Sequence, residues 1–227
     1  MWIDQSRPLK SFLCSLVEKL RPVTTIRLVL LGAKGSGKTS ALNTILGREN
    51  SRRLSRTAQC SVGDAVVFGR QVTAVDTPGW WMNYFCNETP VFDRREMVLS
   101  LSLCPPGPHV FLLVVRVDRA FTETYRRAAQ EHLELISEWI WARTILLFTF
   151  GDWLGEPLRR LVERCGNRYH VLDNKNQGDP AQVTELIQLV EEIRVGSAEE
   201  QQNNEMLRRR NLTKQMRRRD RLSLDCE

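Results

Sequence analysis

Residues 32–39 read Gly32-Ala33-Lys34-Gly35-Ser36-Gly37-Lys38-Thr39. This octapeptide matches the phosphate-binding pattern G-x-x-x-x-G-K-[ST] at every fixed position. Its glycines allow the backbone to turn a ring of N–H groups inward, toward an anion. The lysine supplies a positive charge for the outer phosphates, and the threonine hydroxyl is a ligand for Mg²⁺. The stretch therefore predicts a nucleotide site.

The residues around this loop supply the setting that the pattern requires. The apolar run over residues 26–31 predicts a buried strand, and residues 40–46, closed by Gly47, predict a short helix. A helix that begins at the loop directs its positive end toward a bound phosphate. The alternative is a glycine-rich turn between two core elements, and the match in both pattern and context favours the nucleotide site.

A second motif follows an apolar strand over residues 71–75. It reads Asp76-Thr77-Pro78-Gly79, and Asp76 comes 37 residues after Thr39. An acidic residue at a strand end can hold the Mg²⁺ of a nucleotide through water, and the Gly79 N–H can reach the γ-phosphate. This spacing is typical of GTPases, in which loss of the γ-phosphate releases the following segment. The alternative is a strand-end turn in which Asp76 is only a cap.

The remaining pattern alternates strands with helices, which predicts an α/β fold of the P-loop NTPase (GTPase) kind. We expect three layers around a mostly parallel sheet with one antiparallel strand. The expected strands cover residues 26–31, 65–68, 71–75, 109–117, 144–149 and 169–172, the second and third forming the antiparallel pair. The expected helices cover residues 40–46, 122–139, 157–165 and 180–196, the last capped by Asp179, and residues 80–95 are expected to be irregular.

Charge and cysteine content place limits on the function. The chain has 227 residues and a net charge of +6, and residues 205–222 alone carry an excess of six basic residues. We therefore expect a helical leader over residues 1–23, a GTPase domain over 24–196 and a basic tail over 197–227. The tail is either a solvated segment or a contact for a membrane surface or partner helix. No aromatic residues are interleaved with its arginines, so specific nucleic-acid binding is not expected.

The six cysteines show no metal-ligand spacing, and no signal peptide is visible. We therefore expect a cytoplasmic protein with reduced thiols, and the tail admits peripheral attachment to internal membranes.

Four segments together resemble the immunity-associated GTPases, also called the GIMAP or AIG-type family. They are residues 32–47, residues 76–79, residues 101–108 and residues 165–169. The segments Gly79-Trp80-Trp81 and 151–155 look like the fish branch of that family. The resemblance covers residues 24–195. It implies a septin- and Toc-related GTPase domain, guanine-nucleotide binding with Mg²⁺, nucleotide-dependent self-association, and roles around lymphocyte survival and internal membranes.

The resemblance also implies roles for individual residues. Residues 34–40, including Ser40, would contact phosphates, and Thr57 would be the switch threonine that reaches Mg²⁺ with Thr39 and Asp76. Asp152 would supply the carboxylate that reads guanine, but the usual lysine two positions earlier is absent, and Phe150 or Trp153 would cover the base instead. Asn174 would be the second base contact. A family segment is missing between Pro157 and Leu158, which would loosen the base pocket.

Catalysis is less clearly encoded than binding. Many GTPases place a glutamine after D-x-x-G to orient the attacking water, and this chain has Trp80. No arginine finger can be assigned and Thr57 is the only candidate catalytic residue, so we expect hydrolysis on the order of 10⁻⁴ s⁻¹, raised by self-association. The alternatives are a scaffold that holds GTP or GDP without turnover, and an ATP-using enzyme. The aromatic run over residues 80–85 either forms a nucleotide-dependent contact or folds back over the domain.

Overall fold

The computed structural model of the chain describes residues 25–49, 57–118, 120–149, 156–174 and 179–197. The predicted leader over residues 1–23 and the tail from residue 198 onward lie outside this part. The expected domain limits at residues 24 and 196 therefore stay predictions.

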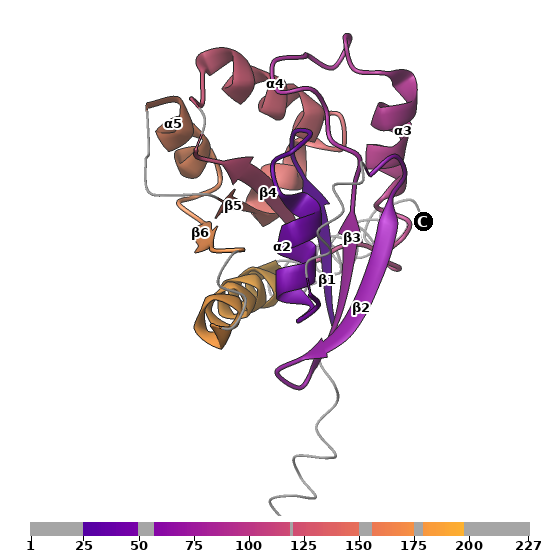
Figure 1. Ribbon diagram of the computed structural model, residues 1–227, viewed down its shortest axis with the longest axis vertical. Coiled ribbons are helices and arrows are strands. Elements are labelled where there is room, and N and C mark those ends of the chain that lie inside the picture. The colour runs from indigo at the N-terminus through magenta and orange to yellow at the C-terminus, as the bar shows by residue number, and fades with distance from the viewer. Residues whose placement is uncertain (1–24, 50–56, 119, 150–155, 175–178, 198–227) are drawn as a thin grey trace, which may run out of the picture.

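A six-stranded sheet forms the centre of the described part, with the strand order β2-β3-β1-β4-β5-β6 (Figure 1). The strands are β1 (Thr25–Leu31), β2 (Ser61–Val67), β3 (Arg70–Asp76), β4 (Val110–Arg116), β5 (Thr144–Thr149) and β6 (Tyr169–Leu172). Neighbouring strands are parallel except for β2 and β3, which form an antiparallel pair. The predicted fold class, with one antiparallel strand, is confirmed.

Helices cover both faces of this sheet and complete three layers (Figure 1). They are α2 (Lys38–Ile45), α3 (Val91–Leu99), α4 (Glu123–Glu134), the 3₁₀ helix η1 (Glu138–Arg143), α5 (Glu156–Arg164) and the helix over residues 180–197. One hydrophobic cluster joins the sheet to α3, α4, η1 and α5, and the other joins it to α2 and the helix over residues 180–197. None of the helices in the described residues combines the length and the apolar character that crossing a bilayer requires.

Burial explains why the central strands have continuous apolar runs. Val110–Val115 on β4 and all of β5 are buried, because helices pack against both faces of these strands. β2 is an edge strand, and its residues alternate between the core and solvent, as in Gly63 and Asp64. The strands β5 and β6 begin and end at the predicted residues.

Three predictions about helices are wrong. Residues 80–95 are not irregular throughout, because α3 begins at Val91. The helix that begins after Thr122 ends at Glu134 and not near Trp139, since η1 intervenes. Gly196 does not end the last helix, which continues to residue 197. Thr122 caps α4, since its hydroxyl accepts a hydrogen bond from the Tyr125 N–H at 3.2 Å.

The topology determines where a ligand site can form. The chain crosses from β1 to β3 on one side and continues to β4 on the other, so the order of the strands reverses beside β1. Ligands of open α/β sheets bind at the carboxyl ends of the strands next to such a point. Residues 32–37 follow β1, and Asp76 ends β3, so both predicted motifs lie at this end.

Candidate nucleotide-binding site

The phosphate loop connects β1 to α2 through three glycines with positive φ. These angles are 148° at Gly32, 77° at Gly35 and 94° at Gly37, which side chains rarely adopt. A Cβ at Gly32 would also lie 2.4 Å from the Val114 carbonyl oxygen. Gly37 caps α2 without a side-chain hydrogen bond, so the first N–H groups of the helix are left for another acceptor.

Lys38 folds back over the loop. Its Nζ donates to the Gly32 carbonyl at 2.9 Å and to the Ala33 carbonyl at 3.1 Å. Burial lowers the pKa of Lys38 to about 8, an effect that Asp76 opposes and Lys34 reinforces. An ammonium group held against the loop by two carbonyls is positioned to meet a phosphate anion.

The ends of β4 and β5 support the loop from outside. The Thr149 hydroxyl donates to the Ser36 carbonyl at 2.8 Å. The Arg116 guanidinium donates to the Gly35 carbonyl at 3.1 Å and forms a bidentate pair with Asp118. These contacts use carbonyl groups of the loop and none of its N–H groups.

Three oxygen-bearing side chains meet beside the loop. The Thr39 hydroxyl lies 2.6 Å from Asp76 Oδ2, and the Thr57 hydroxyl lies 3.1 Å from the same oxygen and 3.2 Å from Thr39 Oγ1. Thr57 reaches this place because β2 runs antiparallel to β3, and Ser61 at its start pairs with Asp76 at the end of β3. The structure therefore brings together the three residues predicted to bind Mg²⁺.

Mg²⁺ fits this set of donors. Hydroxyl and carboxylate oxygens are the ligands that Mg²⁺ prefers. Asp76 is buried, and its Oδ1 has no hydrogen-bond partner among the described residues. A buried carboxylate oxygen without a donor is costly unless a cation or water satisfies it.

The D-x-x-G turn lies directly on the phosphate loop. A Cβ at Gly79 would lie 2.6 Å from the Lys34 nitrogen, 2.7 Å from the Ala33 carbonyl carbon and 2.7 Å from the Gly32 carbonyl oxygen. The Lys34 N–H donates to the Trp80 carbonyl at 2.7 Å. Thr77 fixes the start of the turn by donating to the Leu30 carbonyl at 2.7 Å.

The aromatic run over residues 80–85 divides between the core and the surface. Trp80 is completely buried and stacks on His132 of α4, with ring centroids 4.5 Å apart and planes 8° apart. Trp81 and Tyr84 are exposed. Lys34 Nζ lies 5.2 Å from the Trp81 ring and forms a 2.9 Å ion pair with Asp93 of α3. The run therefore folds back over the domain at Trp80, and a nucleotide-dependent contact through the exposed residues stays a prediction.

The predicted base contacts are described only in part. Asn174 follows β6, where its Oδ1 accepts a hydrogen bond from the Thr44 hydroxyl at 3.1 Å, and its Nδ2 is buried without a partner among the described residues. Asp152, Phe150 and Trp153 lie outside the described residues. The role of Asn174 stays a prediction, and the structure places its amide beside α2.

Several residues at this site were not identified from the sequence. They are Arg116, Thr149, Asp93 and His132, which contact the loop or the residues that hold it. Thr149 and Arg116 had one available signal, since Thr149 ends a predicted strand at the carboxyl edge of the sheet and Arg116 lies one residue before the end of another. Asp93 and His132 lie on helices and carry no comparable signal.

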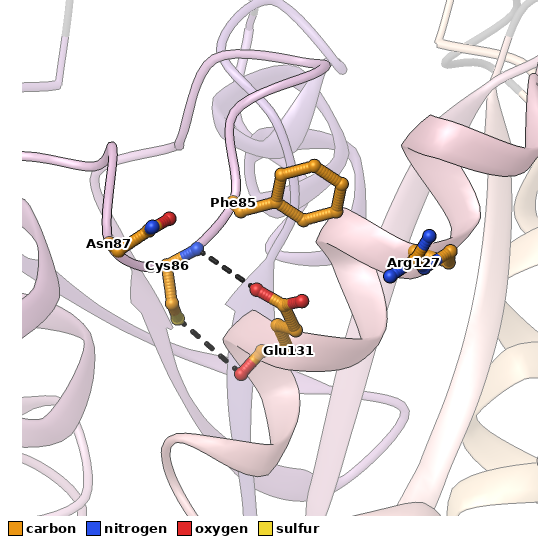
Figure 2. A pocket seen from close by; sticks show the side chains of 5 residues that line it. All are labelled: Phe85, Cys86, Asn87, Arg127 and Glu131. Carbon is orange, nitrogen blue, oxygen red and sulfur yellow. Dashed lines mark hydrogen bonds between the residues drawn. The ribbon is translucent and has the colours of Figure 1, made fainter.

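A pocket of about 360 Å³ lies elsewhere, between residues 85–87 and α4 (Figure 2). It is lined by Phe85, Cys86, Asn87, Arg127 and Glu131. It shares no residue with the phosphate loop or the D-x-x-G turn. The Cys86 N–H donates to Glu131 Oε2 at 3.3 Å, so this contact fastens the segment after Trp81 to α4.

Comparison with known proteins identifies the family to which the sequence is similar. The sequence model of the AIG1 family matches residues 26–221. The chain is 27% identical over 186 residues to GTPase IMAP family member 8 of Homo sapiens, covering 75% of this chain and 27% of that protein. It is 30% identical over 190 residues to immune-associated nucleotide-binding protein 9 of Arabidopsis thaliana, covering 73% of this chain and 54% of that protein. The chain thus spans about a quarter to a half of the length of these relatives.

Solved structures show the same fold. Toc33 from Arabidopsis thaliana in complex with GDP and Mg²⁺ matches with a TM-score of 0.59 and 17% identity, covering 83% of this chain and 90% of that one. The Toc33 complex with Mg²⁺ and GMPPNP matches with a TM-score of 0.58 and 16% identity, covering 83% and 91%. At this identity the likeness concerns the fold alone.

Proposed function

The chain belongs to the AIG1 family, and on this premise we propose that it is a guanine-nucleotide-binding switch protein with slow GTP hydrolysis and nucleotide-dependent self-association. The runner-up is a scaffold that holds GTP or GDP without turnover. The fish-like branch of the family stays a prediction.

One observation carries the proposal. The Thr39 and Thr57 hydroxyls meet Asp76 beside a phosphate loop whose helix has no side-chain cap. A triphosphate with its divalent cation needs this combination of oxygen ligands and free N–H groups. A glycine-rich turn with a purely structural role has no need for a buried carboxylate oxygen without a donor.

Each predicted residue then has a role. Main-chain groups of residues 32–40 bind phosphates, with the Lys38 ammonium adding charge. Thr39, Thr57 and Asp76 hold Mg²⁺, which neutralises phosphate charge when bound. Asn174 and Asp152 contact the base, and the N–H of Gly79 contacts the γ-phosphate.

The environment of Trp80 supports slow hydrolysis. Its side chain is completely buried against His132, so it offers no group to a water molecule at the γ-phosphate. The position that carries a water-orienting glutamine in many GTPases therefore contributes packing alone. Intrinsic hydrolysis without such a group or an arginine finger is on the order of 10⁻⁴ s⁻¹.

An exposed face of α3 supports self-association. Val91, Phe92, Val98 and Leu99 all lie on this helix and are exposed. Exposed apolar side chains in one stripe are typical of a protein contact surface. The same helix carries Asp93, which pairs with Lys34 of the phosphate loop, so the surface is connected to the nucleotide site. Dimerization is important for the GTPase activity of the chloroplast translocon components atToc33 and psToc159, which is a property of those proteins.

The cellular location of the protein is also a proposal. We infer a cytoplasmic location, with the basic residues after 205 as the contact for internal membranes.

Calorimetry with the purified full chain tests the proposal. We expect GDP and GMPPNP to bind with Mg²⁺ and ATP to compete poorly. Preferential binding of ATP would favour the ATP-using enzyme, and absence of binding by all three would overturn the proposal. Phosphate release under saturating GTP separates slow turnover from the scaffold. Sedimentation with GMPPNP and with GDP tests self-association, and Phe92→Glu should reduce the dimer without changing GDP affinity.

A further inference from the structure

His132 lies on α4, and the proposed function gives it no role in binding or hydrolysis. Its side chain is completely buried, and its ring lies flat against Trp80 at 4.5 Å. Trp80 is the residue that follows the D-x-x-G motif. The stack therefore connects a core helix to the turn that senses the γ-phosphate.

Hydrogen bonds fix the orientation of the His132 ring. Its Nδ1 lies 2.7 Å from the Ala128 carbonyl, which can only accept, so Nδ1 carries the hydrogen. Nε2 of the neutral ring therefore accepts, and the Thr89 hydroxyl lies 2.8 Å from it. The Thr89 hydroxyl also lies 3.1 Å from the Phe85 carbonyl, but it has a single hydrogen, and the shorter contact to Nε2 requires that hydrogen because Nε2 can only accept.

Neighbouring contacts hold the same segment against α4. The residue before His132 is Glu131, whose carboxylate accepts the Cys86 N–H (Figure 2). Residues 86 and 89 are thus both hydrogen-bonded to α4, the first to Glu131 and the second to His132. Residues 86–89 therefore cannot move away from α4 without breaking these hydrogen bonds.

The main chain of Trp80 transmits this constraint to the phosphate loop. Its carbonyl accepts the Lys34 N–H at 2.7 Å, and Gly79 beside it is too close to the loop to accommodate a Cβ. The stack thus limits the freedom of both the carbonyl and the Gly79 N–H.

We propose that His132 is a positioning residue, whose ring, stacked on Trp80, holds Gly79 and the Trp80 carbonyl in register with the phosphate loop. This inference rests on the proposed function where it concerns the γ-phosphate. A loosened turn must be ordered when the triphosphate binds, which costs affinity for GTP. GDP has no γ-phosphate, so its affinity does not depend on Gly79.

Two substitutions isolate the ring. His132→Phe and His132→Leu both remove the hydrogen bonds and both fill the site with apolar atoms, but only phenylalanine can stack on Trp80. We expect His132→Leu to raise the ratio of the GMPPNP and GDP dissociation constants by about tenfold, and His132→Phe to leave it within about twofold of the wild type. Leu161→Ala is the matched control, because Leu161 is fully buried in the hydrophobic cluster that contains Trp80 but lies on α5. It should lower the melting temperature and leave the ratio unchanged.

Hydrogen exchange at the Lys34 amide gives a second readout that requires no nucleotide. Exchange should be faster in His132→Leu than in His132→Phe, because the Trp80 carbonyl that accepts this N–H is less constrained. The inference would be overturned if His132→Leu and His132→Phe had the same ratio of GMPPNP and GDP dissociation constants and the same exchange rate at the Lys34 amide. If the wild type binds no nucleotide but the exchange rates differ, the proposed function fails and the positioning role stands.

Discussion

The hydroxyl of Thr39 lies 2.6 Å from Asp76 Oδ2, although 37 positions separate the two residues along the chain. The parallel pairing of β1 with β3 produces this contact, since Leu30 is opposite Asp76 and the phosphate loop follows directly. The contact joins the two motifs that define the candidate site, so it is the first place to test magnesium binding.

Asp76→Asn should remove the magnesium-dependent part of nucleotide affinity. The substitution keeps the size of the side chain and removes the charge that attracts the cation. We expect GDP affinity measured with Mg²⁺ to fall at least about tenfold, toward the value measured in EDTA. Calorimetry with and without Mg²⁺ measures this difference.

Asp64→Asn is the matched control for that experiment. Asp64 lies on β2, and its Oδ1 accepts a hydrogen bond from the Thr73 hydroxyl at 2.6 Å on the exposed face of the same strand pair. Asp64→Asn therefore alters a similar threonine–aspartate contact that lies outside the candidate nucleotide site. An equal loss of magnesium dependence in both variants would contradict the assignment of Asp76.

Nucleotide affinity should fall as the pH rises above about 8. Burial lowers the pKa of Lys38 to about 8, so the free protein loses this charge in mildly alkaline solution. A bound phosphate favours the ammonium, so binding takes up a proton, and the dissociation constant rises up to about tenfold per pH unit above that pKa. Calorimetry at pH 7 to 9, in buffers with different ionisation enthalpies, measures both effects. A dissociation constant that does not change over this range would contradict the prediction.

The elements that were predicted correctly carry their signal in their own residues. Residues 144–149 are apolar or β-branched because helices cover both sides of β5, and the apolar run alone identifies the strand. The phosphate loop was identified because its backbone requires glycine at fixed positions. Local chemistry determined these features, so a single sequence was sufficient.

The elements that were missed depend on distant partners. α3 has no inward apolar stripe, since Met97 is its only buried residue, and its exposed face carries Phe92 and Leu99. The ion pair between Lys34 and Asp93 spans 59 positions, and no local pattern links such residues. The end of α4 was misplaced because residues 135–137 contain neither glycine nor proline to signal a stop.

Gly79→Ala should destabilise the protein by about 1–3 kcal/mol, as overpacking in a close contact does. The added Cβ would lie under 3 Å from the backbone of Gly32, Ala33 and Lys34, and this backbone has little freedom to yield. Denaturant unfolding measures the change. Gly196→Ala is the control: nothing lies within 4 Å of its Cβ position, and it lies in a helix, where alanine stabilises by about 0.5–1 kcal/mol. If Gly79→Ala lowered the free energy of unfolding by no more than Gly196→Ala changes it, the backbone around Gly79 would have room for the added Cβ, and the prediction would be wrong.

Asn174→Ala should reduce the preference for GTP over ATP. The Asn174 amide is held by the Thr44 hydroxyl, and its Nδ2 has no partner among the described residues, as expected for a group that contacts a ligand. We expect the ratio of the ATP and GTP dissociation constants to fall by about five- to tenfold. Thr44→Val should give a smaller fall, because it releases the amide without removing it. An unchanged ratio in both variants would remove Asn174 from the base site.

Stability should fall as the solution is acidified from pH 7.5 to 5, before most carboxylates titrate. Burial lowers the pKa of His109 to about 4, with the positive charges of Arg27, Arg194 and Arg143 adding to the effect. The folded protein therefore keeps the ring neutral, while the unfolded chain takes up a proton below its ordinary pKa of about 6.5. The stabilisation is complete above about 6.5 and is lost progressively as the pH falls toward about 4.

His109→Asn tests the source of this acid sensitivity. Nδ1 of His109 accepts the Arg27 N–H at 3.1 Å, and the asparagine oxygen can accept in its place without titrating. Urea unfolding at pH 7.5, 6.5, 5.5 and 5.0 should show a shallower decline in the variant than in the wild type. Burial also lowers the pKa of His132 and His170, so a residual decline is expected. Parallel curves for the variant and the wild type would show that His109 is not a source of the acid sensitivity.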